Sequence, residues 1–178
     1  MEFVCSDPKG EVRSANVRAT LNAFQLFPGI AEKILQTHQL QLEELRPDRF
    51  VPVQRWLDAM KELQEKLGKS VVQQVGAKII EAAEFPPSFS SAESVLEALD
   101  SIYYLNHRGN VGHYRTSRET DGTLVVRCET PYPRAFERGL VEGIVRNKRL
   151  GNARYSVRYE EGPPEGDLTC TLYVTRFG

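Results

Sequence analysis

Residues 113–147 read HYRTSRETDGTLVVRCETPYPRAFERGLVEGIVRN, and this stretch decides the fold. Residues 113–120 and 123–129 have strand-like composition and flank Asp121-Gly122, a pair typical of a tight hairpin turn. The stretch therefore predicts a β-hairpin with two residues in its turn, followed by an amphipathic helix over residues 134–147. That helix is indicated by apolar residues at helical spacing, namely Phe136, Leu140, Val141, Ile144 and Val145.

Two further strands are predicted after this helix. Apolar and polar residues alternate over residues 154–159 and again over 168–175, as they do in strands with one buried face. The four strands would form two antiparallel pairs, with helices gathered on one face. The predicted fold class is therefore α+β, with an N-terminal helical half packed on a four-stranded antiparallel sheet made of a hairpin, a helix and two strands.

The first half of the chain predicts helices. Gly68 and the pair Pro86-Pro87 are placed to end two of them, and Ser90 and Glu93 have the spacing of a capping box before the last. The segments with a helical apolar period are 14–26, 28–35, 53–67, 69–85 and 91–104.

Length and composition exclude several classes of protein. The 178 residues suit one domain, assigned to residues 14–178, and residues 1–13 are set apart as a possible flexible arm. The net charge is -1, so the chain is not strongly basic, and we expect no binding to nucleic acid. Apolar runs are only a few residues long, so we expect no membrane insertion. The 3 cysteines include no C-x-x-C pair, which favours a reducing, cytoplasmic location.

The sequence carries no motif of a known catalytic chemistry. It has no glycine-rich phosphate-binding pattern, no G-x-S-x-G and no H-E-x-x-H. Gly139 and Gly143 lie four apart within the predicted helix, where glycines usually allow close packing, here against the sheet. His113 and Cys128 would offer two soft metal ligands if they shared a face, and are otherwise a surface histidine and a buried cysteine. We expect neither an enzyme nor a metal site.

One strand of the hairpin carries a polar set that could bind a ligand. Tyr114, Thr116 and Arg118, called the strand triplet below, are spaced by two and point to one side of a strand. A phenol, a hydroxyl and a guanidinium on one face could bind a carboxylate or a propionate. The alternative is the polar, solvent-facing side of a half-exposed sheet.

Aromatic side chains gather near the hairpin in the sequence. Tyr103 precedes it and Tyr132 follows it, and Trp56 of an earlier helix could join them. Aromatic walls with few polar groups are typical of small-molecule pockets. An ordinary hydrophobic core is the alternative interpretation.

The second half of the chain resembles the superfamily of haem-nitric-oxide-binding domains. The resemblance rests on a hairpin, then PYPRAFERGLVEGIVRN at 131–147, then a closing strand DLTCTLYVTRF at 167–177. The superfamily also includes 4-vinyl-reductase-type small-molecule-binding domains and subunits of trafficking complexes. FVPVQRWLDAMKELQEKLG at 50–68 looks like a helix of haem-less bacterial relatives, notably a myxobacterial-type family of unknown function. The resemblance covers residues 16–177.

The resemblance departs from the haem-binding members at their iron site. Those members carry a Tyr-x-Ser-x-Arg triplet at the end of the second hairpin strand and a histidine on the preceding helix. The strand triplet imitates that motif but lies on the first strand, and the matching place, residues 128–132, reads CETPY. Residues 91–104 contain no histidine, and His107 follows in a loop. Since haem iron needs an axial ligand on a packed element, the resemblance implies this fold without haem.

We therefore expect a non-catalytic small-molecule-binding or signalling domain without a cofactor. An apolar or amphipathic ligand would lie between the helices and the sheet, and a homodimer or a signalling partner would carry the output. The first alternative is a structural or adaptor protein that acts through protein contacts, and the second is a haem-based gas sensor with atypical ligation. The expected ligand contacts are Trp56, Tyr103, Tyr114, Thr116, Arg118 and Tyr132.

Overall fold

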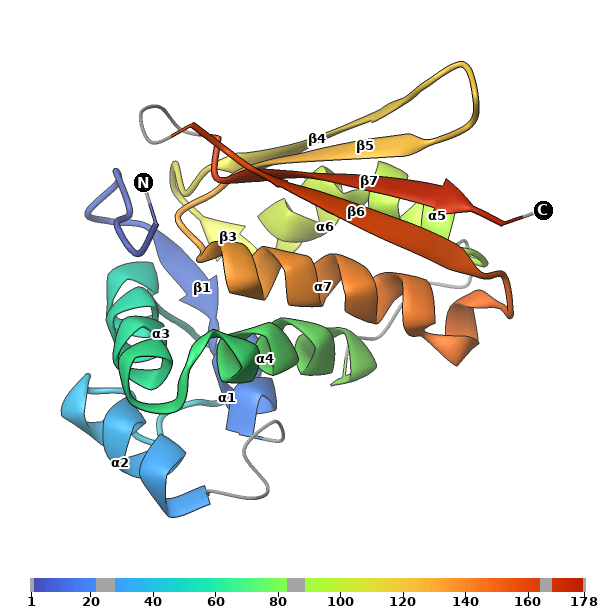
Figure 1. Ribbon diagram of the computed structural model, residues 1–178. Coiled ribbons are helices and arrows are strands. Elements are labelled where there is room, and N and C mark those ends of the chain that lie inside the picture. Colours follow the sequence, from blue (N-terminus) through green and yellow to red (C-terminus); the bar gives the residue numbers. More distant parts are fainter. Residues whose placement is uncertain (1, 22–27, 83–88, 164–167, 178) are drawn as a thin grey trace.

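A computed structural model describes residues 2–21, 28–82, 89–163 and 168–177. Within these residues the chain forms seven α-helices, one short 3-10 helix and two antiparallel sheets (Figure 1). The predicted α+β class is confirmed. The helices are α1 (Ser14–Leu21), α2 (Pro28–Thr37), α3 (Val53–Leu67), α4 (Lys69–Ala82), α5 (Ala92–Glu97), α6 (Leu99–Asn106), α7 (Arg134–Arg146) and η2 (Lys148–Leu150). The strands are β1 (Glu11–Arg13), β2 (Phe50–Pro52), β3 (His107–Arg108), β4 (His113–Arg118), β5 (Leu124–Glu129), β6 (Tyr155–Glu161) and β7 (Cys170–Arg176).

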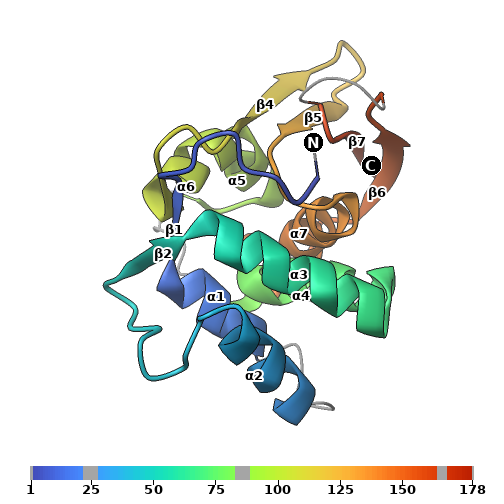
Figure 2. The ribbon, with the colours of Figure 1, turned by 90° about the vertical axis from the view of Figure 1, so that its left-hand side faces the viewer.

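The larger sheet has four strands in the order β4-β5-β7-β6, all antiparallel. Its alternation follows the sequence pattern, since Val126 and Cys128 are buried while Arg127 between them is exposed. Helices α5, α6 and α7 lie on the buried face (Figure 1). Helices α1 to α4 lie on the far side of α7 from the sheet (Figure 2). Helix α7 is thus the element between the helical layer and the sheet.

The hairpin turn between β4 and β5 holds three residues rather than the predicted two. Arg118 pairs with Leu124, and the Glu119 N–H donates to the Thr123 carbonyl oxygen at 2.8 Å. Thr120 to Gly122 therefore form the loop, closed by a bond from the Gly122 N–H to the Glu119 carbonyl oxygen. Gly122 has a φ of 87°, a left-handed conformation that glycine adopts without strain. A three-residue loop needs only one such residue, so the Asp-Gly pair also suits this longer turn.

The sequence did not predict the smaller sheet, which has the order β2-β1-β3. Its strands are only two or three residues long, too short to show an alternating pattern. Strand β1 lies at its centre and includes Val12, which is buried. The expected arm over residues 1–13 thus contributes a central strand. Phe3 also donates its N–H to the Pro131 carbonyl oxygen, and Glu2 accepts from the N–H of Arg134, so this segment contacts the start of α7.

The other helical predictions hold with two corrections. The N-cap of α5 is Ser91, whose hydroxyl accepts from the Ser94 N–H while the Ser94 hydroxyl accepts from the Ser91 N–H. The capping box therefore lies one residue later than Ser90 and ends at a serine. The helix expected over 91–104 is broken at Ala98 into α5 and α6. The ends predicted for the segments 14–26 and 69–85, including Pro86-Pro87, lie outside the described residues. Gly68 does end α3, with a φ of 90°.

Helices α4 and α7 cross with their backbones in contact (Figure 1). A Cβ atom on Gly139 of α7 would overlap the carbonyl oxygen of Gln73, and one on Gly76 of α4 would overlap the carbonyl oxygen of Phe136. A Cβ on Gly143 would lie 2.9 Å from the Cα of Ala77. The glycines thus do permit close packing, but the packing partner is helix α4 and not the sheet.

Replacement of Gly139 by alanine tests this crossing. The new methyl group would meet a backbone oxygen that cannot rotate away, so we expect Gly139→Ala to lower the free energy of unfolding by about 2–3 kcal/mol. Gly29→Ala in α2 is the control, because a Cβ there has open space and alanine favours a helix. Urea unfolding of the two variants measures the difference. Equal stability of G139A and the wild type would contradict a backbone contact at this point.

Candidate functional site

A cleft of about 580 Å³ lies between the helical layer and the sheet layer. Helices α1 and α3 and strand β1 contribute residues on one side, and α6, α7 and β4 contribute residues on the other. Ala15, Asn16 and Ala19 place one face of α1 along it, as expected for residues three and four apart on a helix. The volume falls within the range of small-molecule pockets.

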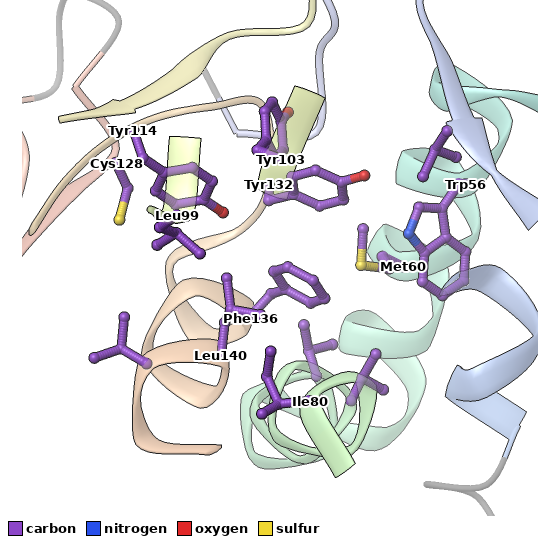
Figure 3. Close-up of a cluster of buried hydrophobic side chains, with 14 of the residues drawn as sticks. Trp56, Met60, Ile80, Leu99, Tyr103, Tyr114, Cys128, Tyr132, Phe136 and Leu140 are labelled. Atoms are coloured by element: carbon purple, nitrogen blue, oxygen red, sulfur yellow. The ribbon is translucent and has the colours of Figure 1, made fainter. Parts of the chain in front are cut away.

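Aromatic rings form one wall of this cleft (Figure 3). The ring of Tyr103 on α6 meets Tyr114 on β4 edge-on at a centroid distance of 5.1 Å and Tyr132 at 6.3 Å. Tyr132 in turn stacks on Phe136 of α7 at 4.8 Å. Trp56 of α3 lies on the opposite side (Figure 3). The rings of Tyr103, Tyr114, Tyr132 and Phe136 thus form one cluster. Such ring pairs stabilise a fold beyond the burial of their surface area.

The hydrogen bonds of His107 fix its tautomer. This residue follows α6 and lines the cleft, with its ring stacked on Tyr103 at 3.9 Å. Its Nδ1 lies 2.9 Å from the Tyr103 carbonyl oxygen, which can only accept, so Nδ1 carries the proton. Its Nε2 therefore accepts from the Tyr132 hydroxyl at 2.7 Å. Burial lowers the pKa of His107 to about 4, so the ring is neutral at pH 7.

Glu137 of α7 is a fully buried carboxyl group directly behind the aromatic wall. Tyr114 donates its hydroxyl to Glu137 Oε2 at 2.8 Å, Thr130 donates to Oε1, and the Cys128 thiol is a third donor. Burial raises the pKa of Glu137 to about 7, and these three donors oppose that rise. Glu137 was not among the expected ligand contacts. Its signal was helical spacing, because Glu137 lies on the same stripe as Leu140.

Four of the six expected ligand contacts line the cleft: Trp56, Tyr103, Tyr114 and Tyr132. Thr116 and Arg118 share the strand face of Tyr114 but lie outside the cleft and contact α5. The Thr116 hydroxyl donates to the Leu96 carbonyl oxygen at 2.8 Å, and Arg118 pairs with Glu97 at 2.7 Å. The strand triplet therefore does not converge on one point.

The described residues contain no group of three or more side chains that could hold a metal ion. His113 is opposite Glu129 and Cys128 is opposite Tyr114 in the β4–β5 register, so His113 and Cys128 lie on opposite faces of the hairpin. Cys128 is buried, as the non-metal interpretation predicted. No helix in the described part of the chain is long and apolar enough to cross a membrane.

Comparison with solved structures places this architecture among known domains. An H-NOX protein from S. oneidensis in the Fe(II) state has a TM-score of 0.69 and 12% identity, over 93% of this chain and 96% of that chain. The fold is that of an H-NOX domain. A mutant H-NOX of T. tengcongensis has a TM-score of 0.68 and 12% identity, over 93% of this chain and 97% of that chain. An oxygen-binding H-NOX domain related to soluble guanylate cyclases has a TM-score of 0.65 and 16% identity, over 91% of this chain and 92% of that chain.

The resemblance to the haem-nitric-oxide-binding superfamily is thus confirmed for the fold. At sequence level, neither family models nor curated proteins match the chain. The likeness to 4-vinyl-reductase-type and myxobacterial-type members stays a prediction. Identities of 12–16% support a shared H-NOX fold but not a shared ligand or activity.

Glu137 and His107 should give folding opposite dependences on pH. The pKa of Glu137 is raised in the folded protein, so its contribution is present below about pH 4.5 and is lost as pH rises through 7. The pKa of His107 is lowered, so its contribution is present above about pH 6.5 and is lost as pH falls through 4. Each amounts to roughly 3 kcal/mol, and the two largely cancel between these limits.

Single substitutions separate the two contributions. Relative to the wild type, Glu137→Gln should gain about 3 kcal/mol of unfolding free energy as pH rises from 4.5 to 7. His107→Gln should gain a similar amount as pH falls from 6.5 to 4. Urea unfolding across this range measures both. Parallel curves for either variant and the wild type would contradict the pKa shift of that residue.

Proposed function

We propose that this chain is a sensory domain whose signal is a small apolar or amphipathic molecule held in the cleft. One observation carries the proposal, namely an aromatic-walled cleft of about 580 Å³ between the two layers of an H-NOX fold. Most of the surrounding side chains are apolar or aromatic, which suits a ligand that leaves water for an apolar site.

Helix α7 is the element through which a ligand would act. Phe136 and Leu140 face the cleft, while Glu137 of the same helix bonds to Tyr114 of β4 and Thr130. A molecule that displaces the two apolar side chains also shifts the helix that carries the buried carboxyl group. Binding would therefore favour one packing of α7 between α4 and the sheet over another. A second copy of the chain or a signalling partner would read that change.

The residues around the cleft do not fit a haem held in the way that the haem-binding members of the superfamily hold it. Helix α6, where the iron ligand would lie, reads LDSIYYLN and has no histidine. The Tyr103 hydroxyl donates to the Val111 carbonyl oxygen, and those of Tyr114 and Tyr132 are bonded as described above. Among the described residues, every buried side-chain nitrogen or oxygen has a hydrogen-bond partner, so none is left free to bind iron. These observations support a ligand other than haem.

A haem-based gas sensor with atypical ligation is the second candidate. The observation that favours it is His107, whose Nε2 carries no proton and which lines the cleft. Its other ring nitrogen donates to a backbone carbonyl oxygen, an arrangement common in metal-binding histidines. Tyr132 would have to release that Nε2 before it could bind iron.

The remaining alternatives have less support. An adaptor is expected to have a filled core and a large apolar patch, whereas this core is opened by the cleft. The described residues that line the cleft include no serine, threonine, cysteine or lysine that could act as a nucleophile, which supports a non-catalytic role. The three unpaired cysteines support a cytoplasmic location.

N-phenyl-1-naphthylamine, a neutral fluorescent probe of apolar sites, tests the proposed function. Ala19 lines the cleft on α1, so Ala19→Leu would fill part of it, and we expect probe affinity to fall about tenfold or more. Arg18→Leu is the matched control, since Arg18 is the exposed neighbour and lies outside the cleft. Fluorescence titration measures both. Absent binding to the wild type, or equal binding to A19L and the wild type, would overturn the proposal.

A further inference from the structure

The mouth of the cleft carries a single permanent positive charge, on Arg13. Among the described residues that line the cleft, Arg13 is the only lysine or arginine, and none is an aspartate or glutamate. The guanidinium carbon of Arg13 lies 5.7 Å from the centroid of the Phe50 ring. Within the described part of the chain, Arg13 forms no ion pair. This exposed cation is therefore available to a ligand.

Arg108 lies at the same Phe50 ring as Arg13, but its charge is paired with a carboxylate. Its guanidinium carbon lies 3.8 Å from the same Phe50 ring, and its Nη1 lies 3.7 Å from a carboxylate oxygen of Glu11. Arg108 does not line the cleft. Of the two arginines at this aromatic ring, the one that faces the cleft is the one without a carboxylate.

The backbone around Arg13 holds it at the mouth. Arg13 ends the central strand β1, where it pairs with Phe50 of β2. The next residue, Ser14, donates its N–H at 2.9 Å and its hydroxyl at 3.0 Å to the Arg49 carbonyl oxygen. Asn16, which is half-buried, also lines the cleft, and its amide has no side-chain bond to other described residues. A guanidinium and an amide can both donate to an anionic head group.

The interior of the cleft offers no comparable polar site. The three tyrosine hydroxyls of the wall are bonded to protein acceptors, and His107 uses both ring nitrogens. Asn106 also lines the cleft, and its amide nitrogen donates to the Ile102 carbonyl oxygen at 2.8 Å. The remaining side chains of this part, such as Phe136 and Leu140, are apolar. Recognition by charge is therefore confined to the mouth, whereas the rest of the cleft favours an apolar body.

We propose that the cleft selects organic anions with one charged head group, such as a monocarboxylate, whose head pairs with Arg13 and whose apolar body lies against the aromatic wall. This inference rests on the proposed function and adds the class of ligand to it. Zwitterions and dianions are disfavoured, since the described mouth has one cation and no acidic side chain.

Two probes with the same ring system test the charge requirement. 8-Anilinonaphthalene-1-sulfonate carries one negative charge, and N-phenyl-1-naphthylamine is the same skeleton without it. We expect Arg13→Gln to weaken binding of the sulfonate about tenfold and to change binding of the neutral probe less than about twofold. Arg13→Lys should restore part of the affinity for the sulfonate. Arg18→Gln, which removes an exposed charge outside the cleft, is the control and should change neither affinity.

The outcomes separate this inference from the proposed function. If A19L blocks both probes but R13Q leaves binding of the sulfonate unchanged, the cleft binds ligands and the role of Arg13 is wrong. The same conclusion follows if R13Q weakens both probes equally. If A19L blocks neither probe, the proposed function itself fails. Selective loss of the sulfonate in R13Q, together with a loss of its binding in high salt that the neutral probe does not show, would support the inference.

Discussion

The backbone contact between α4 and α7 is the constraint on which the rest of the structure depends. The two helices meet at Gly76, Gly139 and Gly143, which have no side chains. Side chains at these positions would keep the two helix axes about 8–10 Å apart. The helical layer is thereby held to the sheet layer along one line. Beside that line bulky side chains such as Trp56 and Tyr132 face each other, and the cleft lies between them (Figure 3). Close packing at one place and open space beside it thus involve the same pair of layers.

The buried carboxyl group of Glu137 links α7 to the sheet. Three hydrogen-bond donors surround it, and none of its described partners is a cation, so burial outweighs hydrogen bonding in setting its pKa. An apolar residue of the same size would avoid this desolvation. A carboxyl group that bonds to Tyr114 of β4 and to Thr130, which directly follows β5, instead ties the helix to one position relative to the sheet. We infer that this bonding makes the position of α7 well defined.

Much of the fold could be predicted because long elements leave clear periods in a sequence. The four-stranded sheet and helix α7 followed from alternation and helical spacing within residues 113–175. Strands β1 to β3 could not be predicted, since two or three residues show no period. The break at Ala98 has no glycine or proline to mark it. For the site, aromatic composition identified Trp56, Tyr103 and Tyr132. Spacing by two identified Tyr114 but also selected Thr116 and Arg118. Shared direction on a strand does not mean a shared target, because Arg118 lies farther along β4 and meets Glu97 of α5.

The central claim is the proposed function, namely that this chain binds a small molecule other than haem as its signal. The most direct measurement is the absorption spectrum of the purified protein from 300 to 700 nm, before and after addition of hemin, with native mass spectrometry of the same sample. The account predicts no Soret band in the purified protein, no stoichiometric band on addition of hemin, and a mass equal to the chain alone or with a small organic ligand. A Soret band with one haem per chain that is lost in His107→Ala would contradict it.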